Sequence, residues 1–271
     1  MSDQPKPPVK KVFLALPTYS NLMRKDFVLS LMESVVWGAI PGVEFSLGTV
    51  GGDGVARARN NLTQAFLLTT DCDYIVYIDV DIVFTKDHLA RLIGHLSPER
   101  PIVGGLYAAK QLSHRWIMTG LQNEPADPAT GLQRVKEVGT GFKGYHRSYF
   151  ERVMAAFPEI KYLCDGAKQE HMIKWDFFSM GVVNGRYLSE DYYADYRAER
   201  IGIPVYVDTT LQLKHQGEFQ YPLLSDMRIT EKIPMATVFK IAETMGCTGH
   251  TVPSEEEVRI AARLHMVEGA A

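Results

Sequence analysis

Apolar segments alternate with helical patterns through the first half of the chain, and this alternation limits the fold more than any other feature. The apolar segments indicate strands at residues 12–18, 43–50, 74–83 and 101–107. Helical patterns occupy residues 24–38, about 54–69, and the segment after Thr85, which is a predicted N-cap. Such alternation favours a mainly parallel sheet with helices on both faces, so the predicted fold class is α/β.

The second half of the chain is less regular. It contains short strand-like segments and two helical patterns, at residues 116–121, 135–142, 147–157, 177–183, 189–200, 205–207 and 211–213. No boundary divides residues 9–224, which we predict to form one domain. A proline-rich lead-in at residues 1–8 is predicted to be disordered, and a C-terminal helical extension is predicted at residues 225–271, with a capping box at Ser254.

Composition argues against several classes of protein. The net charge of -3 gives no electrostatic footprint for nucleic acid. The three cysteines form no C-x-x-C pair, which argues against a disulfide framework or a zinc site. The first residues contain no apolar core region, so no secretory signal is expected, and no apolar stretch is long enough to span a membrane. A cytoplasmic protein without a transmembrane segment is therefore expected.

Two aspartates, Asp79 and Asp81, end the third predicted strand. Side chains alternate along a strand, so both carboxylates are expected on one face. In parallel sheets, ligands bind outside the carboxyl ends of the strands, where the turn at residues 51–54 and the segment after Leu106 also lie. Carboxylates at this edge suit a divalent cation and the phosphates it carries, although a solvated surface turn would carry the same residues.

Two later features carry similar chemistry. Glu190 and Asp191 follow Ser189, the predicted N-cap of a helix. The helix dipole alone favours acidic residues there, but such a carboxylate can also act as a general base. His215 follows a short strand near the end of the domain. It is either a packed histidine or a third ligand for a divalent metal held by carboxylates.

In this order, the features resemble the glycosyltransferases of GT-A fold, a Rossmann-like fold whose members use nucleotide-sugar donors. The resemblance spans about residues 10–222. It rests on Pro17-Thr18-Tyr19 after the first strand, the helical segment 56–61, Asp79-Val80-Asp81 as a D-x-D motif, and Ser189-Glu190-Asp191 followed by His215.

The resemblance implies a role for each acidic residue. Asp81 would bind the metal, and Asp79 would contact the donor ribose, the metal, or both. His215 would complete the protein ligands of Mn²⁺ or Mg²⁺. Asp191 would be the catalytic base of an inverting reaction, with Glu190 as its alternative.

Further residues are implied with less specific signals. Donor contacts are expected from Pro17, Thr18, Tyr19, Arg57, Arg59 and Asn60. The two arginines would equally suit a solvated helix face. Lys110 would reach phosphate or sugar, or is a surface lysine. Trp175 and Asp176 are expected in a loop near the acceptor.

The implied activity is metal-dependent transfer of a hexosyl or pentosyl group from a nucleotide-diphosphate donor to an acceptor hydroxyl. The acceptor stays open among glycans, lipid-linked sugars, small metabolites, proteins and modified DNA bases. Whether the anomeric configuration is inverted or retained also stays open.

Other classes of protein share parts of the pattern. In a haloacid-dehalogenase-type phosphatase, Asp79 would be the nucleophile and Asp81 the general acid, but that motif usually ends the first strand. A non-enzymatic metal-dependent carbohydrate-binding module would keep Asp79, Asp81 and His215 without a base. A nicotinamide-dependent oxidoreductase is disfavoured, because residues 17–20 replace the expected G-x-G-x-x-G.

Overall fold

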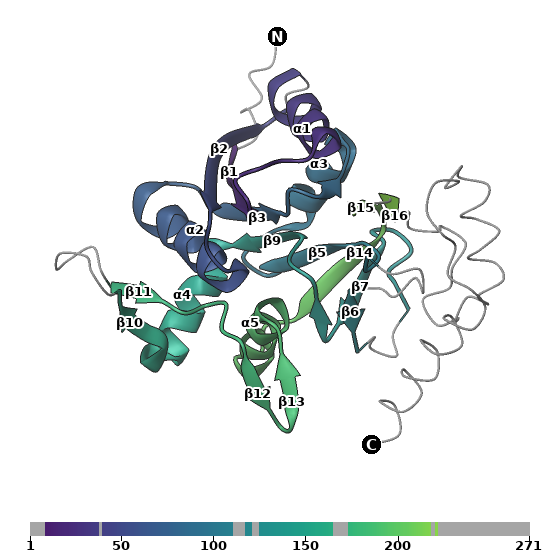
Figure 1. Cartoon of the computed structure of the whole chain (residues 1–271). Coiled ribbons are helices and arrows are strands. Elements are labelled where there is room, and N and C mark those ends of the chain that lie inside the picture. The colour runs from purple at the N-terminus through teal and green to yellow at the C-terminus, as the bar shows by residue number, and fades with distance from the viewer. Residues whose placement is uncertain are drawn as a thin grey trace, which may run out of the picture. The chain divides into compact units, whose positions relative to one another are not determined.

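A seven-stranded mixed sheet forms the centre of the domain (Figure 1). The computed structural model describes residues 9–37, 40–110, 117–120, 125–164, 173–217 and 220–221. The strand order is β2-β1-β3-β9-β5-β14-β7. The strands are β1 (Lys10–Thr18), β2 (Val43–Gly51), β3 (Tyr74–Ile78), β5 (Ile102–Leu106), β7 (Leu132–Val135), β9 (Phe142–His146) and β14 (Val205–Gln212).

The sheet is parallel in two parts, with one antiparallel strand between them. β1 pairs in parallel with β2 and β3, and β5 pairs in parallel with β14. β9 lies antiparallel between β3 and β5, and β7 is antiparallel to β14 at the edge. Because β9 runs the other way, it begins at the edge where the parallel strands end. The predicted mainly parallel α/β sheet is confirmed, with this strand as an insertion.

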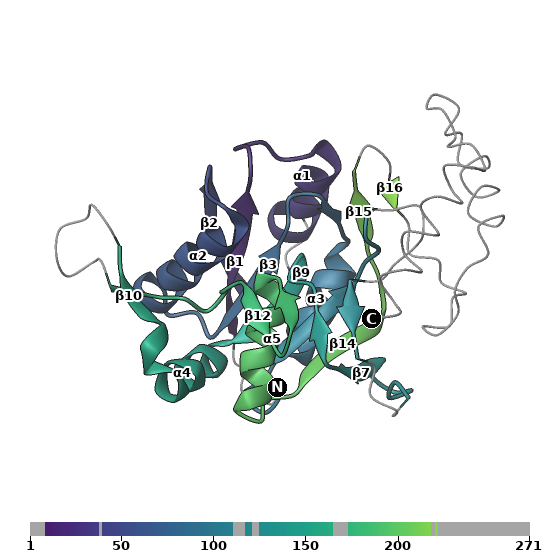
Figure 2. The same cartoon turned by 60° about the horizontal axis from the view of Figure 1, so that its bottom comes forward.

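Helices cover both faces of the sheet (Figures 1 and 2). One core cluster joins the sheet to α2 (Val55–Thr69), α4 (Arg147–Ala156) and α5 (Glu190–Arg200). A second cluster joins it to α1 (Lys25–Leu31) and α3 (Lys86–His95). Burial of these apolar faces is the main force that holds the layers together.

Short two- and three-stranded sheets surround the centre. β4 (Ile82–Val83), β15 (Lys214–Gln216) and β16 (Gln220–Tyr221) form one of them. The other pairs are β6 (Met118–Thr119) with β8 (Glu137–Val138), β10 (Lys161–Leu163) with β11 (Ile173–Trp175), and β12 (Gly181–Val183) with β13 (Arg186–Leu188).

The predicted strand 74–83 is wrong in its second half. The chain leaves the sheet after Ile78 and turns, and the Ile82 amide donates to the Asp79 carbonyl at 2.9 Å. Asp79 and Asp81 therefore do not share one face of a strand. The turn separates two carboxylates that would repel each other, and each finds a different cationic partner.

Other boundaries also differ from expectation. The helix predicted at residues 24–38 is α1 followed by a π-helical turn, Met32–Trp37. Residues 205–207 and 211–212 lie in one continuous strand, β14, which ends before Leu213. The segment 135–142 contains β8 and the start of β9, with glycines between them. Trp175 ends β11 and is not a loop residue. Thr85 is confirmed as the N-cap of α3, with a capping box to His88.

Two predicted segments lie outside the described residues. These are the lead-in at residues 1–8 and the C-terminal extension at residues 225–271 with its capping box at Ser254. Among the residues that are described, no helix is long and apolar enough to cross a membrane.

A buried carboxylate ties β14 to α3. The Asp208 side chain is fully buried, pairs with Arg91, and lies 2.9 Å from Nε2 of His95. The backbone amide and hydroxyl of Thr210 donate to its other oxygen at 2.9 and 2.7 Å. Burial alone would raise the pKa of Asp208, but the hydrogen bonds from His95, Thr210 and Arg91 outweigh burial and hold that pKa well below its usual range.

This pairing predicts a pH-dependent contribution to stability. A lowered carboxyl pKa stabilises the fold above the unfolded-state pKa of about 4, and the effect is lost as the pH falls toward the folded-state value. Asp208→Asn is expected to lower the free energy of unfolding by about 2 kcal/mol at pH 7 and by less at pH 3. Urea denaturation at both pH values measures the difference; an equal loss at both would contradict the assignment.

Candidate active site

A short antiparallel ladder brings Asp81 and His215 together from distant parts of the sequence. β4 begins directly after Asp81 and pairs with β15, with His215 opposite Ile82. The Gln216 amide donates to the Asp81 carbonyl at 2.7 Å. As a result, Nε2 of His215 lies 3.5 Å from Oδ1 of Asp81. The structure thus brings together two of the three predicted metal ligands, whose role as ligands stays a prediction.

The hydrogen bond on the other side of the imidazole determines its tautomer. Nδ1 of His215 lies 2.8 Å from the carbonyl oxygen of Ala108. A carbonyl oxygen can only accept, so Nδ1 carries the hydrogen, and in the neutral ring Nε2 then directs a lone pair toward Asp81. The Tyr107 ring contacts the imidazole edge to face, with the ring centres 5.2 Å apart.

Oδ1 of Asp81 fits a bound cation. It is buried and accepts no hydrogen bond from any described residue. Nε2 of His215 lies 3.5 Å away, so with a neutral ring two electron-pair donors face each other. Such an arrangement is unfavourable without a proton or a metal ion, and carboxylate oxygen with imidazole nitrogen is a donor set that suits Mn²⁺.

The surroundings keep Asp81 ionised. Its Oδ2 pairs with the ammonium group of Lys110. Burial alone would raise the pKa of Asp81, but the hydrogen bonds and charges of His215, when its ring carries a proton on Nε2, and of Lys110 outweigh burial and lower that pKa to about 2. The carboxylate is therefore charged at neutral pH, as metal binding requires.

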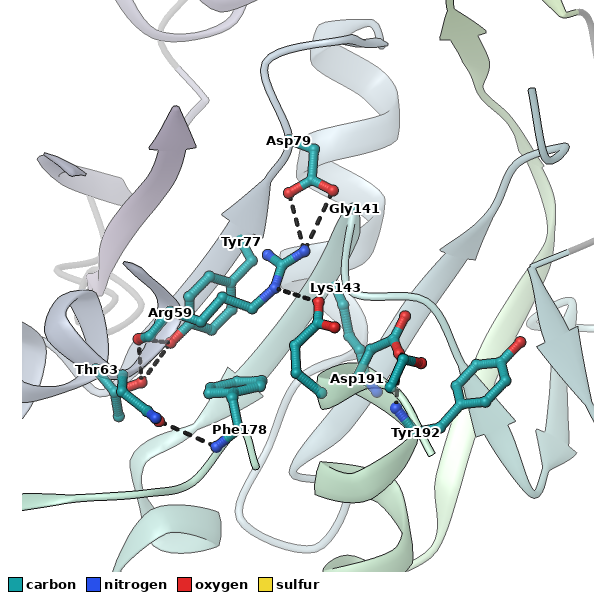
Figure 3. Close-up of polar contacts among 12 residues, drawn as sticks. Arg59, Thr63, Tyr77, Asp79, Gly141, Lys143, Phe178, Asp191 and Tyr192 are labelled. Atoms are coloured by element: carbon teal, nitrogen blue, oxygen red, sulfur yellow. Dashed lines mark hydrogen bonds and ion pairs between the residues drawn. The ribbon is translucent and has the colours of Figure 1, made fainter. Parts of the chain in front are cut away.

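Asp79 has a different partner, the guanidinium of Arg59 (Figure 3). Nη2 of Arg59 lies 3.1 Å from Oδ1 of Asp79 and donates to Oδ2 at 3.2 Å. Its Nε donates to Oε1 of Glu190 at 3.2 Å. Arg59 is almost fully buried, so one cation joins the D-x-D turn to the start of α5.

The backbone around Arg59 is also fixed (Figure 3). The Thr63 hydroxyl donates to the Arg59 carbonyl at 2.8 Å and lies 2.5 Å from the Tyr77 hydroxyl. The guanidinium lies over the Tyr77 ring, 5.6 Å from its centre. Burial lowers the pKa of Arg59, but Asp79, Glu190 and Asp191 raise it by more, so the guanidinium stays charged.

The two acidic residues of α5 differ in environment. Burial raises the pKa of Glu190, and the charge of Arg59 opposes this rise. Asp191 is partly exposed, and its Oδ1 accepts hydrogen bonds from the Ser189 hydroxyl and from the Tyr192 amide, the latter at 2.8 Å. Ser189 is at the N-cap position as predicted, but its side chain orients Asp191 instead of capping the helix.

A buried ion pair anchors the helix that carries these residues. The ammonium of Lys143 on β9 pairs with Asp195 of α5, and both side chains are fully buried. The Val138 amide donates to the other oxygen of Asp195 at 2.8 Å, and Lys143 donates to the Val138 carbonyl at 3.1 Å. Burial raises the pKa of Asp195 to about 6, against the effect of Lys143. Because Asp195 lies one turn after Asp191, this pair fixes the rotation of α5 about its axis.

Close backbone approach explains a glycine beside Asp79. The Asp79 amide donates to the Gly141 carbonyl at 2.9 Å, and the Gly141 amide donates to the Tyr107 hydroxyl at 2.7 Å. A Cβ at position 141 would lie 2.6 Å from that hydroxyl and 3.1 Å from Oδ2 of Asp79. Burial, followed by the charges of Asp79 and Asp191, raises the pKa of Tyr107, so the phenol is neutral.

The predicted donor residues fall into two groups. Pro17 and Thr18 are buried at the end of β1, whereas Tyr19 is 87% exposed. Arg57 is also exposed and lies 3.7 Å from Asp53, one turn earlier, as a solvated helix face would place it. Arg59 alone of the two arginines reaches the acidic cluster.

Asn60 and Asp176 contact each other. Asn60 is buried; its Nδ2 donates to Oδ1 of Asp176 at 2.7 Å, and its Oδ1 accepts from the Phe178 amide at 3.0 Å. The Ser179 hydroxyl donates to the other oxygen of Asp176. Trp175 stacks on Phe177, with the ring centres 6.4 Å apart. Within the described structure, these contacts hold the segment after β11 against α2, and the predicted donor and acceptor roles of these residues stay predictions.

The three-residue metal site stays a prediction as well. In the part of the chain that the structure describes, no group of three or more His, Cys, Asp or Glu side chains is arranged to hold a metal ion. Asp81 and His215 form a pair, and Asp79 is engaged by Arg59. A cation at this pair would take its remaining ligands from water or from a bound substrate.

A comparison with known protein families finds a match over part of the chain. A model of Glycosyl transferase family 2 matches residues 48–154. Over that range, the chain is similar to family 2 glycosyltransferases. The matched range contains Arg59, Asp79 and Asp81, whereas Glu190, Asp191 and His215 follow it. The match supports glycosyl transfer as the activity.

Two solved structures are similar to this one. A197 from STIV is 16% identical, with a TM-score of 0.50, and the match covers 81% of this chain and 92% of A197. GalNAc-T7, solved with UDP, GalNAc and Mn²⁺, is 10% identical, with a TM-score of 0.45 and coverage of 78% of this chain and 44% of GalNAc-T7. No curated protein matches the chain. The match over residues 48–154 bears out the predicted resemblance to the glycosyltransferases, and the similarity to A197 is one of fold alone.

The environment of Asp79 argues against the phosphatase alternative. The carboxylate of Asp79, which would be the nucleophile, is neutralised by an ion pair with Arg59, whose Nη2 donates to Oδ2 at 3.2 Å. The motif also follows the third strand in sequence, not the first.

Several residues of the site were not identified from the sequence. Tyr107, Gly141, Lys143 and Asp195 support it through contacts between segments that are distant in the chain. One signal was available for the ion pair, because Lys143 interrupts an apolar strand and a buried lysine requires an acidic partner. Nothing in the sequence indicates the contact of Tyr107 with His215.

The bridge through Arg59 predicts a large loss of stability on its removal. Arg59→Met leaves the carboxylates of Asp79 and Glu190 without their common cation, which is expected to cost about 3–5 kcal/mol in free energy of unfolding. Urea denaturation measures this loss. Arg57→Met, in the same helix but exposed, is the matched control and should change little. Equal effects of the two variants would show that the Arg59 pairs contribute nothing.

Proposed function

We propose that the protein is a metal-dependent glycosyltransferase that moves a sugar from a nucleotide-diphosphate donor to an acceptor hydroxyl. The observation that carries the proposal is the pair formed by Oδ1 of Asp81 and Nε2 of His215. A buried carboxylate oxygen and a partly buried imidazole nitrogen at the carboxyl edge of the sheet suit a divalent cation. The family match over residues 48–154 supports the type of reaction.

Binding of the donor would use the same edge of the sheet. A divalent ion there, Mn²⁺ or Mg²⁺, would neutralise the charge that develops on the departing diphosphate. Asp79 would contact the ribose through an oxygen that its pairing with Arg59 orients. Pro17, Thr18 and Tyr19 would line the nucleotide site from the end of β1. Arg57 and Asn60 remain weaker candidates for donor contacts, given their present partners.

Proton transfer would fall to Asp191 if the reaction inverts the anomeric centre. The acceptor hydroxyl attacks the anomeric carbon, the bond to the diphosphate breaks, and the hydroxyl proton passes to the carboxylate of Asp191. Glu190 is the second choice, because its ion pair with Arg59 already uses it. Catalysis would come from positioning and from charge stabilisation at the leaving group. Trp175 and Asp176 would lie toward the acceptor, whose identity stays open.

The metal site predicts coupled donor and metal binding. In calorimetric titrations, Asp81→Ala and His215→Ala are each expected to weaken Mn²⁺-dependent binding of the nucleotide-sugar donor by about 10- to 100-fold. His88→Ala, at the start of α3, is the control histidine. The donor is first identified by screening a panel of nucleotide sugars. Release of the nucleotide is measured with Mn²⁺ and with a chelator. Normal donor binding by His215→Ala would remove that residue as a ligand.

The role of Asp191 is tested separately. Asp191→Asn keeps the shape of the side chain but cannot accept the proton, so donor binding should be retained while the transfer rate falls by about 10²–10⁴-fold. Single-turnover product formation with matched donor-binding titrations separates the two quantities. The same two measurements on Glu190→Gln test the alternative base. Unchanged transfer by Asp191→Asn would mean that another group, or no protein group, takes the proton.

Saccharide binding without nucleotide binding would instead favour a carbohydrate-binding module.

A further inference from the structure

The ammonium group of Lys110 occupies one oxygen of the proposed metal ligand Asp81. Lys110 lies four residues after the end of β5, and its Nζ pairs with Oδ2 of Asp81. The lysine side chain is 37% exposed, so its charged end can move into solvent without leaving a buried cavity. From the sequence alone, a solvated surface position was the favoured interpretation of this residue.

The segment that carries Lys110 contacts both proposed metal ligands. The carbonyl of Ala108 fixes the His215 ring, the Tyr107 ring packs against it, and Lys110 pairs with Asp81. Any cation that binds between Asp81 and His215 therefore arrives beside the Lys110 ammonium. Two positive groups at one carboxylate repel each other, and the flexible monovalent one is the easier to displace.

A diphosphate provides a new partner for the displaced ammonium. Lysine is a compact point charge on a flexible stem and binds phosphate oxygens well. The proposed donor would place a diphosphate next to the divalent ion, within the region that the Lys110 side chain already reaches. Asp81 and the diphosphate are thus alternative anionic partners for the same ammonium group.

We propose that Lys110 is an exchangeable cation, which neutralises Asp81 in the donor-free protein and transfers to the donor diphosphate when a divalent ion binds Asp81 and His215. This inference rests on the proposed function. It assigns Lys110 a positioning role that opposes metal binding in the absence of donor and supports donor binding in its presence.

The test measures binding of Mn²⁺ and of nucleoside diphosphates to the full-length protein. Lys110→Met removes the charge and keeps most of the stem. Without nucleotide, electron paramagnetic resonance titration should show Mn²⁺ bound about fivefold more tightly than by the wild type, because the competing ammonium is gone. With saturating Mn²⁺, calorimetry with UDP, GDP, ADP and CDP should show the preferred diphosphate bound about tenfold more weakly.

Two control variants test whether the opposite shifts in affinity come from the charge of Lys110. Lys110→Arg keeps the charge and should reverse most of each shift. Lys11→Met removes a comparably exposed lysine, 41% exposed, that also pairs with an aspartate but lies at the start of β1. It should leave both affinities unchanged.

The outcomes separate the inference from the proposed function. If the wild type binds Mn²⁺ and a diphosphate in an Asp81-dependent manner, but Lys110→Met behaves like Lys11→Met, the ion pair is an ordinary surface contact and the inference is wrong. Weaker binding of both ligands by Lys110→Met would also overturn the exchange. If the wild type binds neither ligand, or binds them without need of Asp81, the proposed function fails, and the inference fails with it.

Discussion

The arrangement of the site depends on one buried guanidinium. Arg59 contacts Asp79 after β3 and Glu190 at the start of α5. It therefore joins the end of β3 to the helix that carries the proposed base. A buried charge is costly unless it is paired, and here two carboxylates also depend on it. Helix α5 is held a second time by Lys143 and Asp195. Together the two ion pairs fix both the position and the rotation of α5 relative to the D-x-D turn.

Short-range patterns in the sequence were sufficient for most of the fold. The apolar strands, the helices α2 and α4, and the cap at Thr85 follow from local periodicity and capping chemistry. Local patterns could not place β9 between β3 and β5, because antiparallel insertion is decided by contacts between distant segments. Local patterns also led to the wrong prediction that the third strand continues through Asp81, because Val80, Ile82 and Val83 remain apolar although the chain turns there.

The site was predictable in its residue types but not in its pairings. Asp81 and His215 lie together as expected, because the strand before each one delivers it to the same edge of the sheet. Asp79 was expected beside Asp81 on a strand face, yet it turns toward Arg59. The amphipathic helix α2 offered no means to distinguish Arg59, which is buried, from Arg57, which is solvated; only the packing of α5 against the sheet does so.

The hydrogen bond from His215 to Ala108 has a consequence for how such a site can change. The acceptor is a main-chain oxygen, so the protonation pattern of the imidazole is encoded by the path of the backbone and not by any side chain. Replacement of Ala108 by another residue would leave this acceptor in place. The hydrogen bond that sets the tautomer of the ring is therefore insulated from point substitutions at its partner, whereas an insertion, a deletion or a shift in the strand ladder would move the acceptor.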